Sequence, residues 1–167
     1  NIMSTVGKGS DFMFSLHLGV QREVINGEID LYQELADKTA FIIDSNKLTV
    51  HQYAQELSEF SIKAVSASSG EMALQRLISL AEADQYDFII IERNLIDNSG
   101  INIIKELKNE SSTTSIPIIL SSKTGFGDLT ERERSCGIDE FLVKPIKNNN
   151  LLKSLINLFN LDYDPPQ

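Results

Sequence analysis

The sequence lacks several features that would assign it to well-defined classes of protein. Cys136 is the only cysteine among 167 residues, so the chain forms no internal disulfide bond, which fits a reducing compartment. Its apolar runs are far shorter than the roughly 20 residues of a membrane-spanning helix. No charged stretch followed by an apolar one opens the chain, so we expect no signal peptide. These absences favour a cytoplasmic location and no membrane contact by this chain.

Positive charge is also scarce. The chain has 15 Lys and Arg residues against 24 Asp and Glu residues, which gives a net charge of −9. Because nucleic-acid binding depends on a basic surface, we expect no nucleic-acid partner. The acidity alone identifies no other partner, since many soluble proteins share it. A hydrophobic fraction of 41% is sufficient for a packed core.

From residue 40 onward, short apolar runs alternate with amphipathic stretches. The runs are 40–43, 62–65, 88–91, 116–120 and 138–143. They are rich in β-branched and aromatic residues, and several are apolar without alternation. This pattern is typical of strands that are buried on both faces of a parallel sheet.

The stretches between the runs predict helices. Apolar residues recur at helical spacing within 50–57, 73–81, 101–107 and 151–159, and a short charged helix is expected at about 128–136. Ser68 with Glu71, and Asp128 with Glu131, predict two capped helix starts. Five strand–helix units predict an open, doubly wound α/β sheet with helices on both faces.

Polar residues follow four of the expected strands. Asp44 and Ser45 follow the first, Glu92 ends the third, Ser122 the fourth and Lys144 the fifth. Functional residues of such sheets collect at the carboxyl ends of the strands. We therefore expect these side chains to form one site.

In this order the residues resemble the receiver domain of two-component response regulators, over about 120 residues. Glu92 stands at the phosphoacceptor position, and Gly100 matches the glycine that follows the active-site loop. Ser122 matches the hydroxyl that binds the phosphoryl group, Lys144 the lysine, and Phe141 the switch aromatic. The resemblance implies a flavodoxin-like five-stranded parallel sheet with strand order 2-1-3-4-5.

Two of the site residues depart from the family pattern. The phosphoacceptor is an aspartate in the family, and Ser45 replaces a second acid that helps to bind magnesium. Glu92 is one methylene longer than aspartate, and in-line transfer depends on positioning to about an ångström. Asp44, Glu92 and the Asn94 carbonyl would bind Mg²⁺ weakly at most. We therefore expect no cofactor, and a pseudo-receiver that is not phosphorylated in the ordinary way.

The role of Glu92 is open between two interpretations. Glu92 can pair with Lys144 and imitate the phosphorylated form, which would hold Ser122 and Phe141 in an active-like arrangement. Alternatively, Glu92 is a relic in a pocket that is kept for stability. Two further functions remain as alternatives: a working phosphoacceptor that uses Glu92 or a nearby acid such as Asp97, and a pseudo-receiver that binds a small effector.

Residues 6–18 resemble the end of a histidine-kinase ATP-binding domain. Gly7, Gly9 and Ser10 match its glycine-rich box, and an alternating strand follows at 12–18. A dinucleotide-binding loop is excluded because no strand is expected before the glycines and a strand, rather than a helix, follows them. About twenty residues cannot form the ATP-binding domain. We expect this chain to lack enzyme activity and to come from a hybrid sensor histidine kinase, a phosphotransferase that is itself a candidate for membrane anchoring.

The expected organisation is a kinase remnant at 1–20, a linker at 21–38 with room for a short helix, a receiver domain at 39–160 and a tail at 161–167. The expected partners are the parent kinase core, a neighbouring receiver or a phosphotransfer domain. A homodimer is the alternative assembly. The family's usual contact face, made by the last two helices and the last strand, corresponds to about 128–160. The resemblance thus implies regulation by protein contact.

Overall fold

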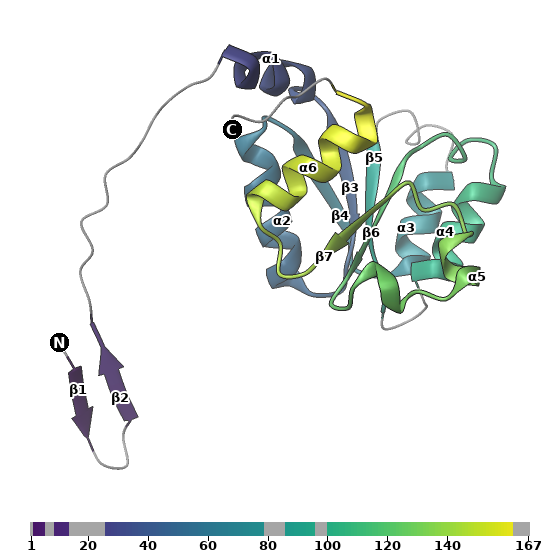
Figure 1. The fold of residues 1–167 in the computed structure, drawn as a ribbon. Helices are drawn as coiled ribbons and strands as arrows, with labels where there is room; N and C mark the ends of the chain where they lie inside the picture. The colour runs from purple at the N-terminus through teal and green to yellow at the C-terminus, as the bar shows by residue number, and fades with distance from the viewer. Residues whose placement is uncertain (1, 6–8, 14–25, 79–85, 96–99, 162–167) are drawn as a thin grey trace.

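A five-stranded parallel sheet forms the centre of the computed structural model, which describes residues 2–5, 9–13, 26–78, 86–95 and 100–161 (Figure 1). Its strand order is β4-β3-β5-β6-β7, or 2-1-3-4-5 when these strands are counted along the chain. The strands are β3 (Thr39–Ile43), β4 (Lys63–Ala67), β5 (Phe88–Glu92), β6 (Ile118–Ser122) and β7 (Glu140–Val143). The predicted fold class is confirmed.

The burial of each strand follows its place in the sheet. All residues of the central strands β5 and β6 are buried, and so are four of the five residues of β3. The edge strands β4 and β7 leave most of their residues partly or fully exposed. The apolar runs without alternation are therefore the strands that are covered on both faces.

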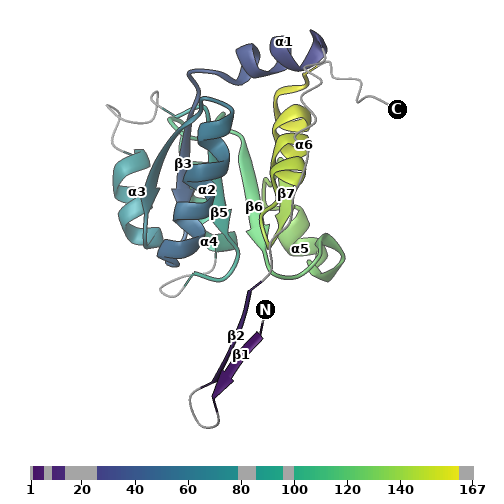
Figure 2. The same ribbon diagram turned by 90° about the vertical axis from the view of Figure 1, so that its left-hand side faces the viewer.

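Helices cover both faces of the sheet (Figures 1 and 2). The helices α2 (Lys47–Glu59) and α6 (Asn148–Phe159) pack on one face, and α3 (Gly70–Ile78) and α4 (Gly100–Asn109) pack on the other. A short helix, α5 (Glu131–Arg134), precedes β7. No helix in the described ranges is long and apolar enough to cross a membrane.

The first predicted helix cap is wrong by one residue. The hydroxyl of Ser69, not that of Ser68, accepts the backbone N–H of Met72 at 3.2 Å. Because α3 begins at Gly70, Ser69 is the residue that directly precedes the helix. That position is the one from which a side chain reaches the unpaired N–H groups of the first turn.

The second predicted cap is also wrong. Asp128 belongs to a 3₁₀ turn, Phe126–Asp128, and its carboxylate accepts the N–H of Gly125 at 3.0 Å. Helix α5 instead begins after Thr130, which forms a reciprocal capping box with Glu133. A carboxylate that already closes one turn cannot cap the next, so the helix starts three residues later than expected.

Part of the segment expected as a linker is the helix α1 (Asn26–Leu35). Leu31 and Leu35 are buried in the same apolar cluster as residues of α2 and α6. The ring of Tyr32 stacks on that of Phe60, with 5.6 Å between the ring centroids. The second half of α1 is therefore packed on the receiver-like domain, and residues 21–25 lie outside the described ranges.

The first residues form a hairpin of β1 (Ile2–Thr5) and β2 (Gly9–Phe12), paired antiparallel. The expectation that no strand precedes the glycines is therefore wrong. The exclusion of a dinucleotide site still holds, because such sites need a helix after the glycines and β2 is a strand. Gly9 has a φ of +103°, a value that favours glycine. Gly7 and the rest of the predicted strand beyond Met13 lie outside the described residues.

Candidate functional site

The expected side chains meet in a cleft at the carboxyl ends of the strands. Asp44 follows β3, Glu92 ends β5 and Lys144 follows β7. The cleft has a volume of about 390 Å³ and is lined by Asp44, Ser45, Asn46, Thr49, Glu92, Asn94, Lys123 and Lys144. The parallel sheet brings these residues together from segments that are up to 100 positions apart in the chain.

An ion-paired triad occupies the floor of the cleft. The ammonium group of Lys144 donates to Asp44 Oδ2 at 2.7 Å and to Glu92 Oε2. Asp44 and Glu92 are only 4% and 7% exposed. Burying charges is costly, and mutual pairing offsets that cost only when the remaining oxygens are also satisfied.

Backbone N–H groups satisfy the other carboxylate oxygens. Asn46 donates to Asp44 Oδ1 at 2.8 Å, and Asn94 donates to Glu92 Oε1 at 3.1 Å. Each carboxylate therefore accepts one hydrogen bond from the ammonium group and one from the loop that follows its own strand. Such charge-assisted bonds fix both side chains in place.

Gly100 explains why a glycine is needed eight residues after Glu92. Its N–H donates to the carbonyl oxygen of Arg93 at 2.9 Å, which closes the loop back onto the end of β5. A Cβ at this position would clash with the carbonyl oxygen of Glu92. Only glycine lets α4 begin this close to the site.

Ser122 ends β6 but is not among the residues that line the cleft. It is fully buried, and its Oγ accepts the N–H of Thr124 and shares a hydrogen bond with Thr124 Oγ1, both at 3.2 Å. Over the described ranges, Ser122 makes no hydrogen bond to Glu92 or Lys144 through its hydroxyl. Lys144 therefore bonds to the two acids, whereas the hydroxyl of Ser122 bonds to Thr124.

Phe141 is half-buried on β7. Its ring packs against the apolar cluster beneath α3 and α4, and it meets the ring of Phe126 edge to face with 5.4 Å between centroids. Phe126 itself is 47% exposed. Phe141, the residue expected at the switch position, is therefore partly buried against the domain.

A buried tyrosine, Tyr53, bonds to a residue next to Glu92. Tyr53 on α2 donates its hydroxyl hydrogen to Ser121 Oγ at 2.6 Å, and Ser121 lies directly beside Glu92 in the sheet. Burial raises the pKa of Tyr53 well above its ordinary value, and Asp44 and Glu92 add to that effect. The phenol therefore stays neutral. Sequence reasoning missed Tyr53 because its position on the helix stripe looked purely apolar.

The residues present do not fit a divalent cation well. Both carboxylates already pair with Lys144, and Ser45 offers no third. No group of three or more His, Cys, Asp or Glu side chains suited to a metal occurs in the described part of the chain. Mg²⁺ prefers octahedral oxygen ligands with carboxylates free to neutralise it. In the triad, the ammonium group of Lys144 is the cation that pairs with the two carboxylates.

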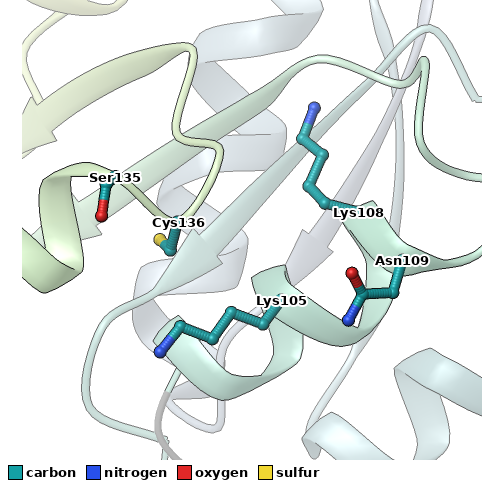
Figure 3. Close-up of a pocket in the computed structure, with 5 residues that line it drawn as sticks. All are labelled: Lys105, Lys108, Asn109, Ser135 and Cys136. Carbon is teal, nitrogen blue, oxygen red and sulfur yellow. The ribbon is translucent and has the colours of Figure 1, made fainter.

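A second cleft of about 390 Å³ lies beside α4 and is lined by Lys105, Lys108, Asn109, Ser135 and Cys136 (Figure 3). The ammonium group of Lys108 bonds to Asp139 and to the carbonyls of Thr114 and Ile116, so its role is structural. Burial raises the pKa of the Cys136 thiol, which disfavours a reactive thiolate. This cleft therefore lacks the convergent charges of the first.

Comparison with known proteins agrees with the fold. The chain is 25% identical over 109 residues to hybrid signal transduction histidine kinase L of Dictyostelium discoideum, a match that covers 64% of this chain and 6% of that protein. It is 24% identical over 118 residues to the polar-differentiation response regulator DivK of Brucella ovis, covering 71% of this chain and 93% of the regulator.

Solved structures show the same fold. Chemotaxis response regulator CheY4 of Vibrio cholerae superposes with a TM-score of 0.63 at 21% identity, covering 72% of this chain and 98% of that one. A CheX–CheY–BeF3–Mg complex from Borrelia burgdorferi gives a TM-score of 0.67 at 19% identity, covering 77% and 93%. The family model for the response regulator receiver domain matches residues 40–156. The chain therefore belongs to the response regulator receiver family of two-component signalling.

Proposed function

We propose that this chain is an atypical receiver that acts by protein contact and is not phosphorylated at the usual position. The observation that carries the proposal is the triad, in which Lys144 bonds to both Asp44 and Glu92. An incoming phosphoryl group needs a free carboxylate as nucleophile and a divalent cation to neutralise its charge. In the triad, both carboxylates are engaged and the cation is the protein's own ammonium group.

Partial imitation of the phosphorylated form is part of the proposal. Glu92 places its carboxylate against Lys144, where a phosphoryl oxygen would be received, and Phe141 is packed inward. Ser122 is bonded to Thr124 instead of to Glu92. These contacts favour a state in which Lys144 and Phe141 are active-like and Ser122 is not.

The parent protein in this proposal is a hybrid histidine kinase. Two observations support it: the similarity to hybrid kinase L, and the glycine box before the receiver domain, of which Gly9 adopts a conformation suited to glycine. The partners would then be the kinase core, a neighbouring receiver or a phosphotransfer domain. The contact surface would comprise α5, β7 and α6, and a homodimer would use the same surface.

Labelling with a small acyl phosphate in the presence of Mg²⁺ tests the proposal. Transfer would form an acyl phosphate on a protein carboxylate and release the donor's carboxylate, which intact-mass measurement detects. We expect no labelling of the wild-type chain, and labelling of a Ser45→Asp, Glu92→Asp double variant, in which the two acids are restored. The two single variants serve as controls and should label less than the double variant.

Each other outcome would count against the proposal. Labelling of the wild-type chain at Glu92 or at another acid such as Asp97 would show a working phosphoacceptor. A double variant that folds but takes no label would show that the pocket is no longer a receiver site that two acids can restore.

A further inference from the structure

Arg93, the residue that follows Glu92, links the site to helix α5. Its Nε and Nη2 donate to Glu133 Oε1 at 3.1 and 2.9 Å, and its Nη1 donates to Thr124 Oγ1 at 3.1 Å. The side chains of Arg93 and Glu133 are 19% and 20% exposed, so the pair is largely shielded from solvent. A guanidinium group can hold two acceptors at once because its donors form a rigid fork.

The Glu133 end of this link reaches the start of α5. Glu133 Oε2 accepts the N–H of Thr130 at 2.8 Å and its hydroxyl at 2.9 Å. In return, the N–H of Glu133 donates to Thr130 Oγ1 at 3.3 Å. The residue that pairs with Arg93 is therefore the same residue that caps α5.

The Thr124 end of the link reaches the phosphoryl-binding hydroxyl. Thr124 Oγ1 lies 3.2 Å from Ser122 Oγ and is also the acceptor for Arg93. Thr124 is thereby held in the position from which it bonds to Ser122. A continuous chain of hydrogen bonds thus runs from Ser122 through Thr124, Arg93 and Glu133 to Thr130.

We propose that Arg93 is a positioning residue that fixes the Ser122 hydroxyl and helix α5 together, so that a change at one is transmitted to the other. Both arms depend on a single side chain. Leu129 and Cys136 anchor the two ends of α5 in the core, but α5 itself has only four residues, and Thr124 lies on the surface loop after β6. The coupling requires only that α5 and Ser122 keep these contacts, and it holds whether or not the site accepts phosphate.

Residue-resolved amide hydrogen exchange tests this coupling in the unlabelled chain. In Arg93→Gln, we expect the amides of Thr124, Arg134 and Ser135 to exchange at least about tenfold faster, since hydrogen bonds to charged groups are lost on both arms. The amides of Ile90 and Ile119 in the central strands should change much less. Arg76→Gln is the matched control, because the guanidinium group of Arg76 on α3 also donates a hydrogen bond, to the carbonyl oxygen of Ser66 on the opposite edge strand β4.

Two further variants separate a coupling role from a merely structural one. Glu133→Gln alters only the α5 arm, so faster exchange at Thr124 in this variant would show transmission through Arg93. Arg93→Lys keeps the charge but not the fork, so it should protect α5 more than Thr124. Unchanged exchange at Thr124 in Glu133→Gln, or equal acceleration of all amides including those of Ile90 and Ile119 in Arg93→Gln, would overturn the proposal.

Discussion

The two sides of the site are held by different forces. On the acidic side, Asp44, Glu92 and Lys144 form a nearly dry triad of charges. On the hydroxyl side, Ser122 joins a chain of hydrogen bonds that ends at the partly exposed pair of Arg93 and Glu133. On the acidic side the charges pair with one another, whereas the hydroxyl side is tied to a surface helix.

The difference shows that ion pairs can fix one side of a site while its other side is held by a separate hydrogen-bond network. Glu92 ends β5 and Lys144 follows β7, on either side of β6, and the long side chains of the two residues meet across the end of that strand. Engaging Ser122 would also require Thr124 to release it, and Arg93 opposes that release. Charge therefore fixes one side, and a competing hydrogen-bond network fixes the other.

The largest expected effect comes from breaking the acidic side with Lys144→Met. This change leaves two buried carboxylates next to each other without a cation, and removing one partner of a buried pair costs about 3–5 kcal/mol. Urea unfolding at neutral pH measures the loss. Lys123→Met is the control, because Lys123 lines the same cleft but is exposed. Equal, small losses in both variants would mean that the triad is not a buried ion pair.

Glu92→Gln has a smaller expected effect on the free energy of unfolding, and it distinguishes the contribution of Glu92 from that of Asp44. The variant keeps the size of the side chain and leaves Lys144 paired with Asp44, so we expect a loss of about 2 kcal/mol, typical of a hydrogen bond to a charged group. Glu106→Gln, on the exposed side of α4, is the control and should lose less than about 0.5 kcal/mol. A gain in stability for Glu92→Gln would show that repulsion between the acids exceeds their attraction to Lys144.

Tyr53→Phe tests the buried hydrogen bond between Tyr53 and Ser121, which lies next to the site. The variant leaves the buried hydroxyl of Ser121 without its donor, which costs about 1–2 kcal/mol. Adding Ser121→Ala should recover much of the loss, because the unsatisfied group is then removed as well. The same loss with and without Ser121→Ala would indicate a packing defect and no role for the hydrogen bond.

The sequence predicts which residues meet at the site better than it predicts which of them bond to one another. The strand ends located Asp44, Glu92, Ser122 and Lys144 because residues at the same edge of a parallel sheet must lie close together. The same argument could not say which side chains bond to one another. The hydroxyl of Ser122 bonds to Thr124 Oγ1, which also accepts from Arg93, and the direction of the Arg93 side chain is set only in the folded loop.

Two other features could have been read more closely from the sequence. Thr130 and Glu133 have capping-box spacing, but Asp128 and Glu131 share that spacing, and the sequence alone favoured the earlier pair. Likewise, Leu31 and Leu35 are four residues apart, as on one face of a helix, but their polar neighbours suggested a linker. In both cases tertiary packing selects between local patterns of similar strength.

The smallest expected effect concerns the hydroxyl side at acid pH. The hydrogen bond from the Thr130 backbone lowers the pKa of Glu133, and Arg93 lowers it further. A lowered folded-state pKa gives stability that is present above the usual glutamate range and is lost as the pH falls through the folded value. We therefore expect the α5 amide signals to titrate at a lower pH than an ordinary glutamate would produce. In Arg93→Gln the midpoint should rise; an unchanged midpoint would mean that Arg93 does not act on Glu133.

The central proposal is that Lys144 already pairs with Asp44 and Glu92, so that these acids take neither cation nor phosphoryl group. An NMR titration with Mg²⁺ and beryllofluoride, a phosphoryl analogue, tests it most directly by following the amides of Asp44, Glu92 and Ser122. We predict no saturable shifts in the wild-type chain and clear, saturable shifts in the Ser45→Asp, Glu92→Asp variant. Saturable shifts at these three amides in the wild-type chain would contradict the claim.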